Sequence, residues 1–137
     1  MKVKINNKIR NYTPTLNRFG RNIDCVEFND GTKIVKVGMF CNWLGYSDVT
    51  PYEIVDVNKS GKTITIREMD AKLVDSFKPE FIAGGFSANC TNQNEQEYDY
   101  TSIKDGYTQK VRMSKKGFGL GRFKISYVPC KFHDYNF

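Results

Sequence analysis

The chain has 137 residues, which suits one domain with a core that needs no metal or disulfide to hold it. Its hydrophobic share of 39% and charged share of 26% are those of a soluble globular protein, and no apolar run is long enough to span a bilayer. The formal net charge of +6 favours anionic partners such as nucleic acid or nucleotides, and solubility alone is the other interpretation.

The four cysteines are Cys25, Cys41, Cys90 and Cys130, and they lie far apart without a Cys-x-x-Cys pair. This spacing argues against a zinc ribbon or a redox motif. The first residues are charged and lack the apolar region of a signal peptide. We therefore expect a cytoplasmic protein with reduced thiols and without a cofactor.

The first segment, residues 1–22, is polar and basic and is broken by Pro14 and Gly20. It predicts an N-terminal arm with at most a short strand at Val3–Ile5. Residues 23–137 then form a single β domain. In that domain, two alternating runs, residues 24–28 and 32–37, bracket an Asn-Asp-Gly turn and indicate a hairpin.

A buried strand is expected at Met39–Leu44, and the clearest hairpin of the chain follows at Tyr52–Glu68. Its two arms alternate in period 2 with β-branched residues around the polar turn at residues 58–61. In the first arm Val55 and Val57 share the buried face, while Glu53 and Asp56 lie near water. In the second arm the buried positions are isoleucines, Ile64 and Ile66.

Beyond Glu68 the pattern changes. Residues Met69–Phe77 form either one short helical turn, whose period their apolar positions fit, or a continuation of the strand. An inserted polar loop follows near residues 78–97. Residues 97–101 and 108–113 read as the two arms of a further hairpin, and residues 122–128 as the last strand. The aromatic residues at the C-terminus suggest a tail packed on the body. The fold class is all-β with one short helix at most, either a small SH3-like barrel or a sandwich of antiparallel hairpins.

No catalytic constellation is recognisable. The single histidine, His133, excludes a two-histidine site, so we expect no catalytic residue and no metal ligand. The glycines at 117, 119 and 121 resemble a phosphate loop, but a strand follows them where such a loop needs a helix. A hairpin turn is the better interpretation, with anion binding by its backbone amides left open.

Three kinds of group could hold a phosphorylated ligand: rings that stack on a base, cations that pair with phosphate, and amides that read base edges. The alternative is that the tyrosines pack the edge of the core and the cations only solvate the surface. The candidate ligand-binding residues are Trp43, Tyr52, Arg67, Asn92, Gln93, Gln96, Tyr98, Arg112 and Arg122.

Several motifs resemble a family of small proteins carried by tailed phages and prophages. They are Ser-Gly-Lys-Thr-Ile at 60–64, Pro-Glu-Phe-Ile-x-Gly-Gly-Phe at 79–86, Cys-Thr-Asn-Gln-x-Glu-Gln-Glu-Tyr at 90–98, and the terminal Asp-Tyr-Asn-Phe at 134–137. The family is similar to phage anti-defence proteins that sequester nucleotide immune signals, the anti-CBASS and anti-Thoeris sponges.

The resemblance implies a homo-oligomer in the cytoplasm of an infected bacterium that encloses a cyclic nucleotide without cleaving it. Arg112 or Arg122, an aromatic residue and the loop at residues 92–96 would supply the contacts. Two alternatives stay open: a β-barrel that binds single-stranded nucleic acid, and a non-catalytic protein-interaction or virion module.

Overall fold

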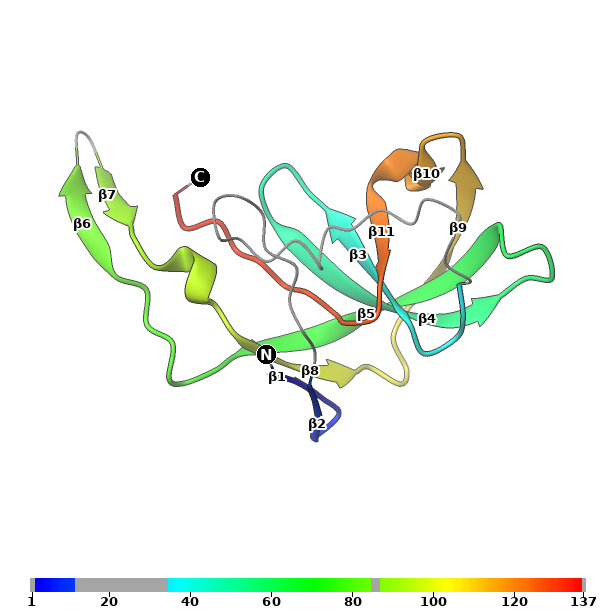
Figure 1. Cartoon of the computed structure of the whole chain (residues 1–137), viewed down its shortest axis with the longest axis horizontal. Coiled ribbons are helices and arrows are strands. Elements are labelled where there is room, and N and C mark those ends of the chain that lie inside the picture. Colours follow the sequence, from blue (N-terminus) through cyan, green and yellow to red (C-terminus); the bar gives the residue numbers. More distant parts are fainter. Residues whose placement is uncertain (1, 12–34, 85–86, 137) are drawn as a thin grey trace.

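The computed structural model describes residues 2–11, 35–84 and 87–136, and strands dominate this part of the chain (Figure 1). Nine strands of the described residues form one strongly curled sheet that resembles half a barrel. Its order is β11-β3-β4-β5-β8-β1-β2, with β9 beside β5 and β10 beside β9. The all-β, barrel-like fold class expected from the sequence is therefore confirmed.

The N-terminal residues belong to this sheet. β1 (Lys2–Ile5) and β2 (Lys8–Asn11) are joined by Asn6 and Asn7, whose φ angles of 50° and 65° are those of a two-residue hairpin turn. β1 also pairs in parallel with β8, and it buries Val3 and Ile5. Residues 2–11 are thus part of the domain and not a separate arm, while residues 12–22 of the expected arm lie outside the described residues.

The hairpin predicted at residues 24–37 also lies outside the described residues, except for residues 35–37, which are not in a strand. The strand predicted next to it is confirmed as β3 (Phe40–Leu44). It runs antiparallel between β11 and β4. Cys41 and Asn42 are both fully buried in this strand.

The hairpin at Tyr52–Glu68 is confirmed as β4 (Val49–Val57) and β5 (Thr63–Leu73). The register shifts between Ile54 and Asp56, as a β-bulge does, and the bulge changes which side chains face the core. Ile54 is buried instead of Val55, and Glu53 is half-buried instead of facing water. The assignment of faces from simple alternation was wrong for Val55 and Glu53, whereas Asp56 is exposed and Val57 packs against the core as expected.

Of the two alternatives for Met69–Phe77, the helix is wrong and the continuing strand is confirmed as far as Leu73, where β5 ends. Met69 is buried between exposed charged neighbours, which is the period of a strand. The long β5 pairs through residues 63–67 with β9 (Thr108–Ser114) and through residues 69–73 with β8 (Tyr98–Ser102). These two strands were expected to pair with each other, but each pairs with a different half of β5.

The segment expected to be a polar loop contains a second, two-stranded sheet. β6 (Phe81–Gly84) pairs with β7 (Ser87–Cys90), and a 3-10 turn, η2 (Gln93–Glu95), follows. Figure 1 shows this hairpin projecting at one end of the molecule. The opposite end holds β9, β10 (Gly117–Phe118) and η3 (Gly119–Gly121), and β11 (Phe123–Ser126) returns beside β3.

Two hydrophobic cores form on opposite faces of β5. In its first half Ile64 and Ile66 point to one face, and in its second half Met69 points to the other. The change of face lets the curled sheet cover two clusters. The first is Met39, Cys41, Ile54, Ile64, Ile66, Val111, Phe118 and Ile125, and the second is Val3, Ile5, Phe40, Met69, Tyr100 and Val128.

Among the cysteines of the described residues, Cys41 and Cys90 are free and buried, and Cys130 is disulfide-bonded. The expectation of reduced thiols is therefore wrong for Cys130. Desolvation raises the pKa of the Cys41 thiol well above its ordinary value. The described part of the chain contains no helix long and apolar enough to cross a membrane.

Candidate functional site

The amides expected to read a ligand instead hold the C-terminal tail, residues 128–136. Oε1 of Gln96 accepts a hydrogen bond from the amide of His133 at 3.0 Å, and its Nε2 donates to the carbonyl of the same residue at 2.6 Å. Gln93 accepts a bond from the amide of Tyr135 at 3.0 Å. Asn136 closes the tail through two bonds to the backbone of Cys90. The paired bonds of Gln96 and of Asn136 each satisfy one backbone amide and one carbonyl, as a neighbouring strand would.

The first half of the tail is held from β3 and β8. Asn42 donates to the carbonyl of Val128 at 3.3 Å and accepts from the amide of Cys130 at 2.9 Å. The hydroxyl of Tyr100 accepts from the amide of Lys131. Figure 1 shows the tail running from β11 toward the β6–β7 hairpin. The expectation that the tail packs on the body is confirmed, and side-chain amides hold much of it in place.

Asn92 is also committed to the fold. Its side chain accepts a bond from the amide of Glu80 at 2.8 Å and donates to the carbonyl of Lys78 at 2.8 Å. These bonds fix the start of β6 to the end of β7. All three amides proposed as ligand contacts therefore satisfy backbone groups of this chain.

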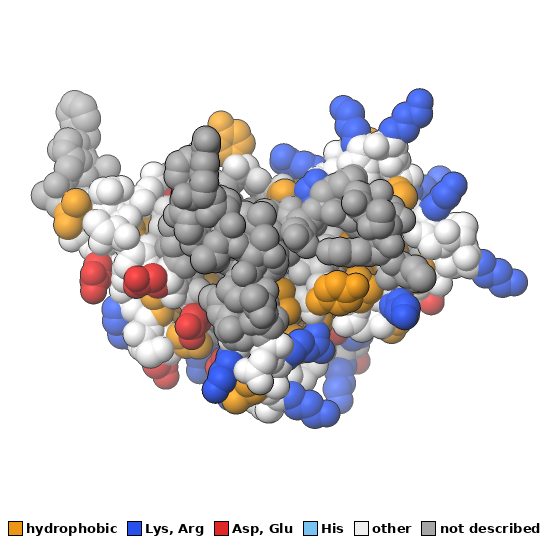
Figure 2. Space-filling view, in the orientation of Figure 1, with side chains coloured by type: hydrophobic (Ala, Val, Ile, Leu, Met, Phe, Trp, Pro, Cys, Tyr) orange, Lys and Arg blue, Asp and Glu red, His pale blue; other side chains and the backbone are white. Residues whose placement is uncertain are grey.

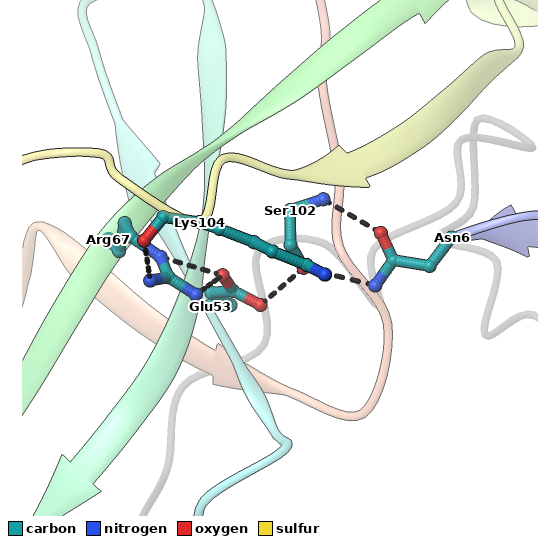
Figure 3. Close-up of polar contacts among 5 residues, drawn as sticks. All are labelled: Asn6, Glu53, Arg67, Ser102 and Lys104. Atoms are coloured by element: carbon teal, nitrogen blue, oxygen red, sulfur yellow. Dashed lines mark hydrogen bonds and ion pairs between the residues drawn. The ribbon is translucent and has the colours of Figure 1, made fainter.

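Arg67, another candidate, belongs to a polar network that joins four parts of the sheet (Figure 3). Its Nε and Nη2 donate to Oε1 of Glu53 at 3.0 and 2.6 Å, and its Nη1 donates to the carbonyl of Lys104 at 2.8 Å. The other carboxylate oxygen of Glu53 accepts from Ser102, and Ser102 bonds in turn to Asn6. The guanidinium is directed into the protein, so its role is structural.

The two tyrosines among the candidates pack against the body. Tyr52 meets Phe123 edge to face with ring centroids 5.7 Å apart, and burial raises its pKa. The hydroxyl of Tyr98 donates to Gln96 at 2.6 Å. Burial, helped by the nearby Tyr135 and Asp48, raises the pKa of Tyr98 to about 12.

The remaining candidates, Trp43, Arg112 and Arg122, lie at the opposite end of the molecule, which we call the basic end. It comprises the stretch from Lys110 to Lys124, which contains no acidic residue. Within the described residues, five of its cations form no ion pair. The cations of the stretch are Lys110, Arg112, Lys115, Lys116, Arg122 and Lys124, of which Lys124 has its pKa lowered by burial.

The charge of the molecule is separated along its length. The stretch from Glu68 to Asp99, which includes the β6–β7 hairpin, carries seven acidic residues and two lysines. Figure 2 shows many Lys and Arg side chains around the basic end, while Asp and Glu are prominent below the β6–β7 hairpin. A net charge of +6 thus conceals a strongly positive end and a negative one.

An aromatic ring lies beside these cations. The guanidinium of Arg122 lies over the ring of Trp43, with its Cζ 5.8 Å from the ring centroid. Trp43 is half-buried on β3, which pairs with β11 at Phe123. Tyr46 follows three residues later in the β3–β4 turn and is 86% exposed. Trp43 and Arg122 are the one pair of candidates that the described structure places in contact outside the tail.

The glycine-rich turn within the basic end has a left-handed backbone conformation. Gly119, Leu120 and Gly121 all have positive φ, at 56°, 58° and 83°. A Cβ on Gly119 would lie 2.5 Å from Cδ2 of Phe123, and one on Gly121 would lie 2.7 Å from the carbonyl oxygen of Lys116. Leucine in this conformation costs about 1–2 kcal/mol. The turn expected here is confirmed, and its left-handed form could not be read from the glycine spacing.

The candidate residues are therefore not gathered at one place: Tyr52 and Arg67 are packed or bonded within the main sheet, and the others lie toward its two ends. Asn92, Gln93, Gln96 and Tyr98 lie near the tail, and Arg112 and Arg122 lie at the basic end (Figure 1). Sequence reasoning missed the buried Asn42 and the Glu53 network. An asparagine inside an otherwise apolar strand was the available signal for Asn42, because a buried amide must find partners.

Comparison with known proteins does not assign the chain to a family. No family model matches the chain, and neither a curated protein nor a solved structure matches it. Within the described residues no group of His, Cys, Asp and Glu is arranged to hold a metal ion. The fold and site define a curled β-sheet protein with one cationic end.

Proposed function

We propose that this protein binds single-stranded nucleic acid through its basic end and does not cleave it. The observation that carries this proposal is the uninterrupted cationic stretch from Lys110 to Lys124, where five cations have no ion pair within the described residues. Cations without an acidic partner are available for phosphates, and binding releases counterions from the nucleic acid. The acidic stretch at the other end would repel a phosphate backbone, so it orients the ligand.

Single strands are favoured over duplexes by the ring beneath Arg122. Unpaired bases stack on aromatic side chains, and this contact tolerates any sequence. Trp43 lies beneath Arg122 beside the cations, where a base would meet its ring. The amides that could have read base edges are bonded to backbone groups of this chain, which favours binding without strong sequence preference.

The test is fluorescence anisotropy with a labelled oligothymidine at several salt concentrations. With about five phosphate contacts, log Kd should change with log salt with a slope near 3.5, so that affinity falls about 100-fold between 50 and 200 mM salt. Replacing Lys115 and Lys116 by glutamine should reduce the slope by about 1.4. The matched control replaces Lys72 and Lys78 by glutamine. It removes the same amount of charge from the acidic stretch, and it should bind as the wild type does.

A cyclic nucleotide held between subunits of a homo-oligomer is the second candidate, and the resemblance to phage anti-defence sponges suggests it. The contact between Trp43 and Arg122 favours it, since a ring and a phosphate fork lie together. Enclosure of so small a ligand requires a second chain, in the cytoplasm of an infected bacterium. The protein would be incubated with cyclic dinucleotides and cyclic ADP-ribose isomers and then heated. Recovery of intact ligand by mass spectrometry supports this candidate, and absence of retention rejects it.

A further inference from the structure

Leu120 occupies a position where its side chain is costly for the fold. It is the centre of three consecutive residues with positive φ, and its own angles are φ 58° and ψ 31°. The glycines on both sides are required, since a Cβ on either would collide with Phe123 or Lys116. No contact requires leucine at the central position, and glycine would adopt the same backbone conformation without strain.

Burial does not offset this strain. The side chain of Leu120 is 72% exposed, so little of its apolar surface is removed from water. A strained and exposed leucine is therefore unfavourable for the free protein on both counts. Strained residues of this kind are found most often at ligand-binding and other functional sites.

The surroundings indicate which ligand. Leu120 lies between Lys115–Lys116 on one side and Arg122 on the other along the chain, in a stretch without acids. An apolar side chain flanked by cations can enter between two bases while the cations hold the adjacent phosphates. One leucine offers too little apolar surface to hold a protein on a membrane. A base step, which is the size of one side chain, fits it better.

We propose that Leu120 inserts between adjacent bases of the single strand that the basic end binds. This inference rests on the proposed function. Cations give the backbone contact, and Leu120 adds a contact that depends on the presence of bases. The strained turn is then retained because it presents the leucine side chain outward, toward the ligand.

The test compares wild type, L120G and L120M on two oligonucleotides of equal length, oligothymidine and an abasic strand. Wild type should prefer oligothymidine about tenfold. L120G should have a smaller preference, since only base stacking on Trp43 remains, while binding the abasic strand as wild type does. Its Tm should rise by about 3 °C because strain is relieved. L120M should keep the preference, since methionine still offers an apolar side chain.

The outcomes separate the two proposals. If wild type binds oligothymidine but L120G binds it equally well, the insertion is refuted and the nucleic-acid function stands. If wild type binds neither strand, both proposals fall. If L120G instead loses binding to phosphatidylserine vesicles and keeps its preference for oligothymidine, Leu120 is a membrane contact and the inference is overturned.

Discussion

Replacing Gln96 by alanine tests whether the amide-rich segment serves the fold or a ligand. The variant loses two hydrogen bonds to the backbone of His133 and the acceptor for the hydroxyl of Tyr98. Each such bond contributes about 0.5–1.5 kcal/mol, and water can reach the exposed His133, so the total loss should be about 2 kcal/mol. For a domain of this size, this corresponds to a Tm lower by about 6 °C.

Urea unfolding and amide hydrogen exchange measure the effect. Exchange should accelerate at the amides of residues 133–136, because the tail opens locally before the sheet unfolds. Asn89→Ala is the matched control, since Asn89 is exposed on β7 and its side chain has no hydrogen bond to the described residues. If Q96A keeps the stability and exchange of this control but loses affinity for oligothymidine, Gln96 is a ligand contact and the structural interpretation is refuted.

Two further variants test the buried polar groups. Asn42→Ala should lower the free energy of unfolding in urea by about 2–4 kcal/mol, because it leaves the carbonyl of Val128 and the amide of Cys130 without partners at a fully buried site. A smaller loss of stability than that of Asn89→Ala would contradict this. Folding raises the pKa of Tyr98 from an ordinary value of 10.0 to about 12, so between these values the unfolded chain has lost a proton that the folded one keeps, and stability falls as pH rises. Tyr98→Phe should lose less stability than wild type between pH 10 and 11, and an equal loss would show that another group controls this range.

Local sequence pattern predicted the strands well where the pattern was strictly alternating. The hairpin around residues 58–61 and the strand at Met39–Leu44 were found because their buried residues follow period 2. Pairing between strands was harder. β8 and β9 are close in sequence and look like hairpin partners, but β5 is long enough to pair with both. Nothing in residues 97–113 reveals the length of a strand thirty residues earlier.

The helical alternative at Met69–Phe77 failed for a related reason. Its apolar positions fit the helical period, but Met69 is buried because the second half of β5 turns its other face to a second core. A change of buried face along one strand disturbs simple alternation, as does the bulge that moved Ile54 inward. Both effects are set by tertiary packing.

The candidate site was predicted by residue type, and residue type alone does not show whether a group is already satisfied. The amides of Asn92, Gln93 and Gln96 were suitable for a ligand, but backbone groups of this chain use them first. The partners of Gln93 and Gln96 lie in the tail, and those of Asn92 are Lys78 and Glu80. Arg112 and Arg122 were named from the sequence, and the other cations of the basic end lie close to them along the chain. Groups that were near in sequence were therefore easier to assign than groups brought together by the fold.

Mapping of backbone amide chemical shifts by NMR during titration with oligothymidine would locate the ligand most directly. We predict that the shifts concentrate in residues 110–124 and at Trp43, and that they weaken as salt is raised. Shifts concentrated in residues 92–98 and in the tail, with the basic end unchanged, would contradict the assignment of binding to the basic end.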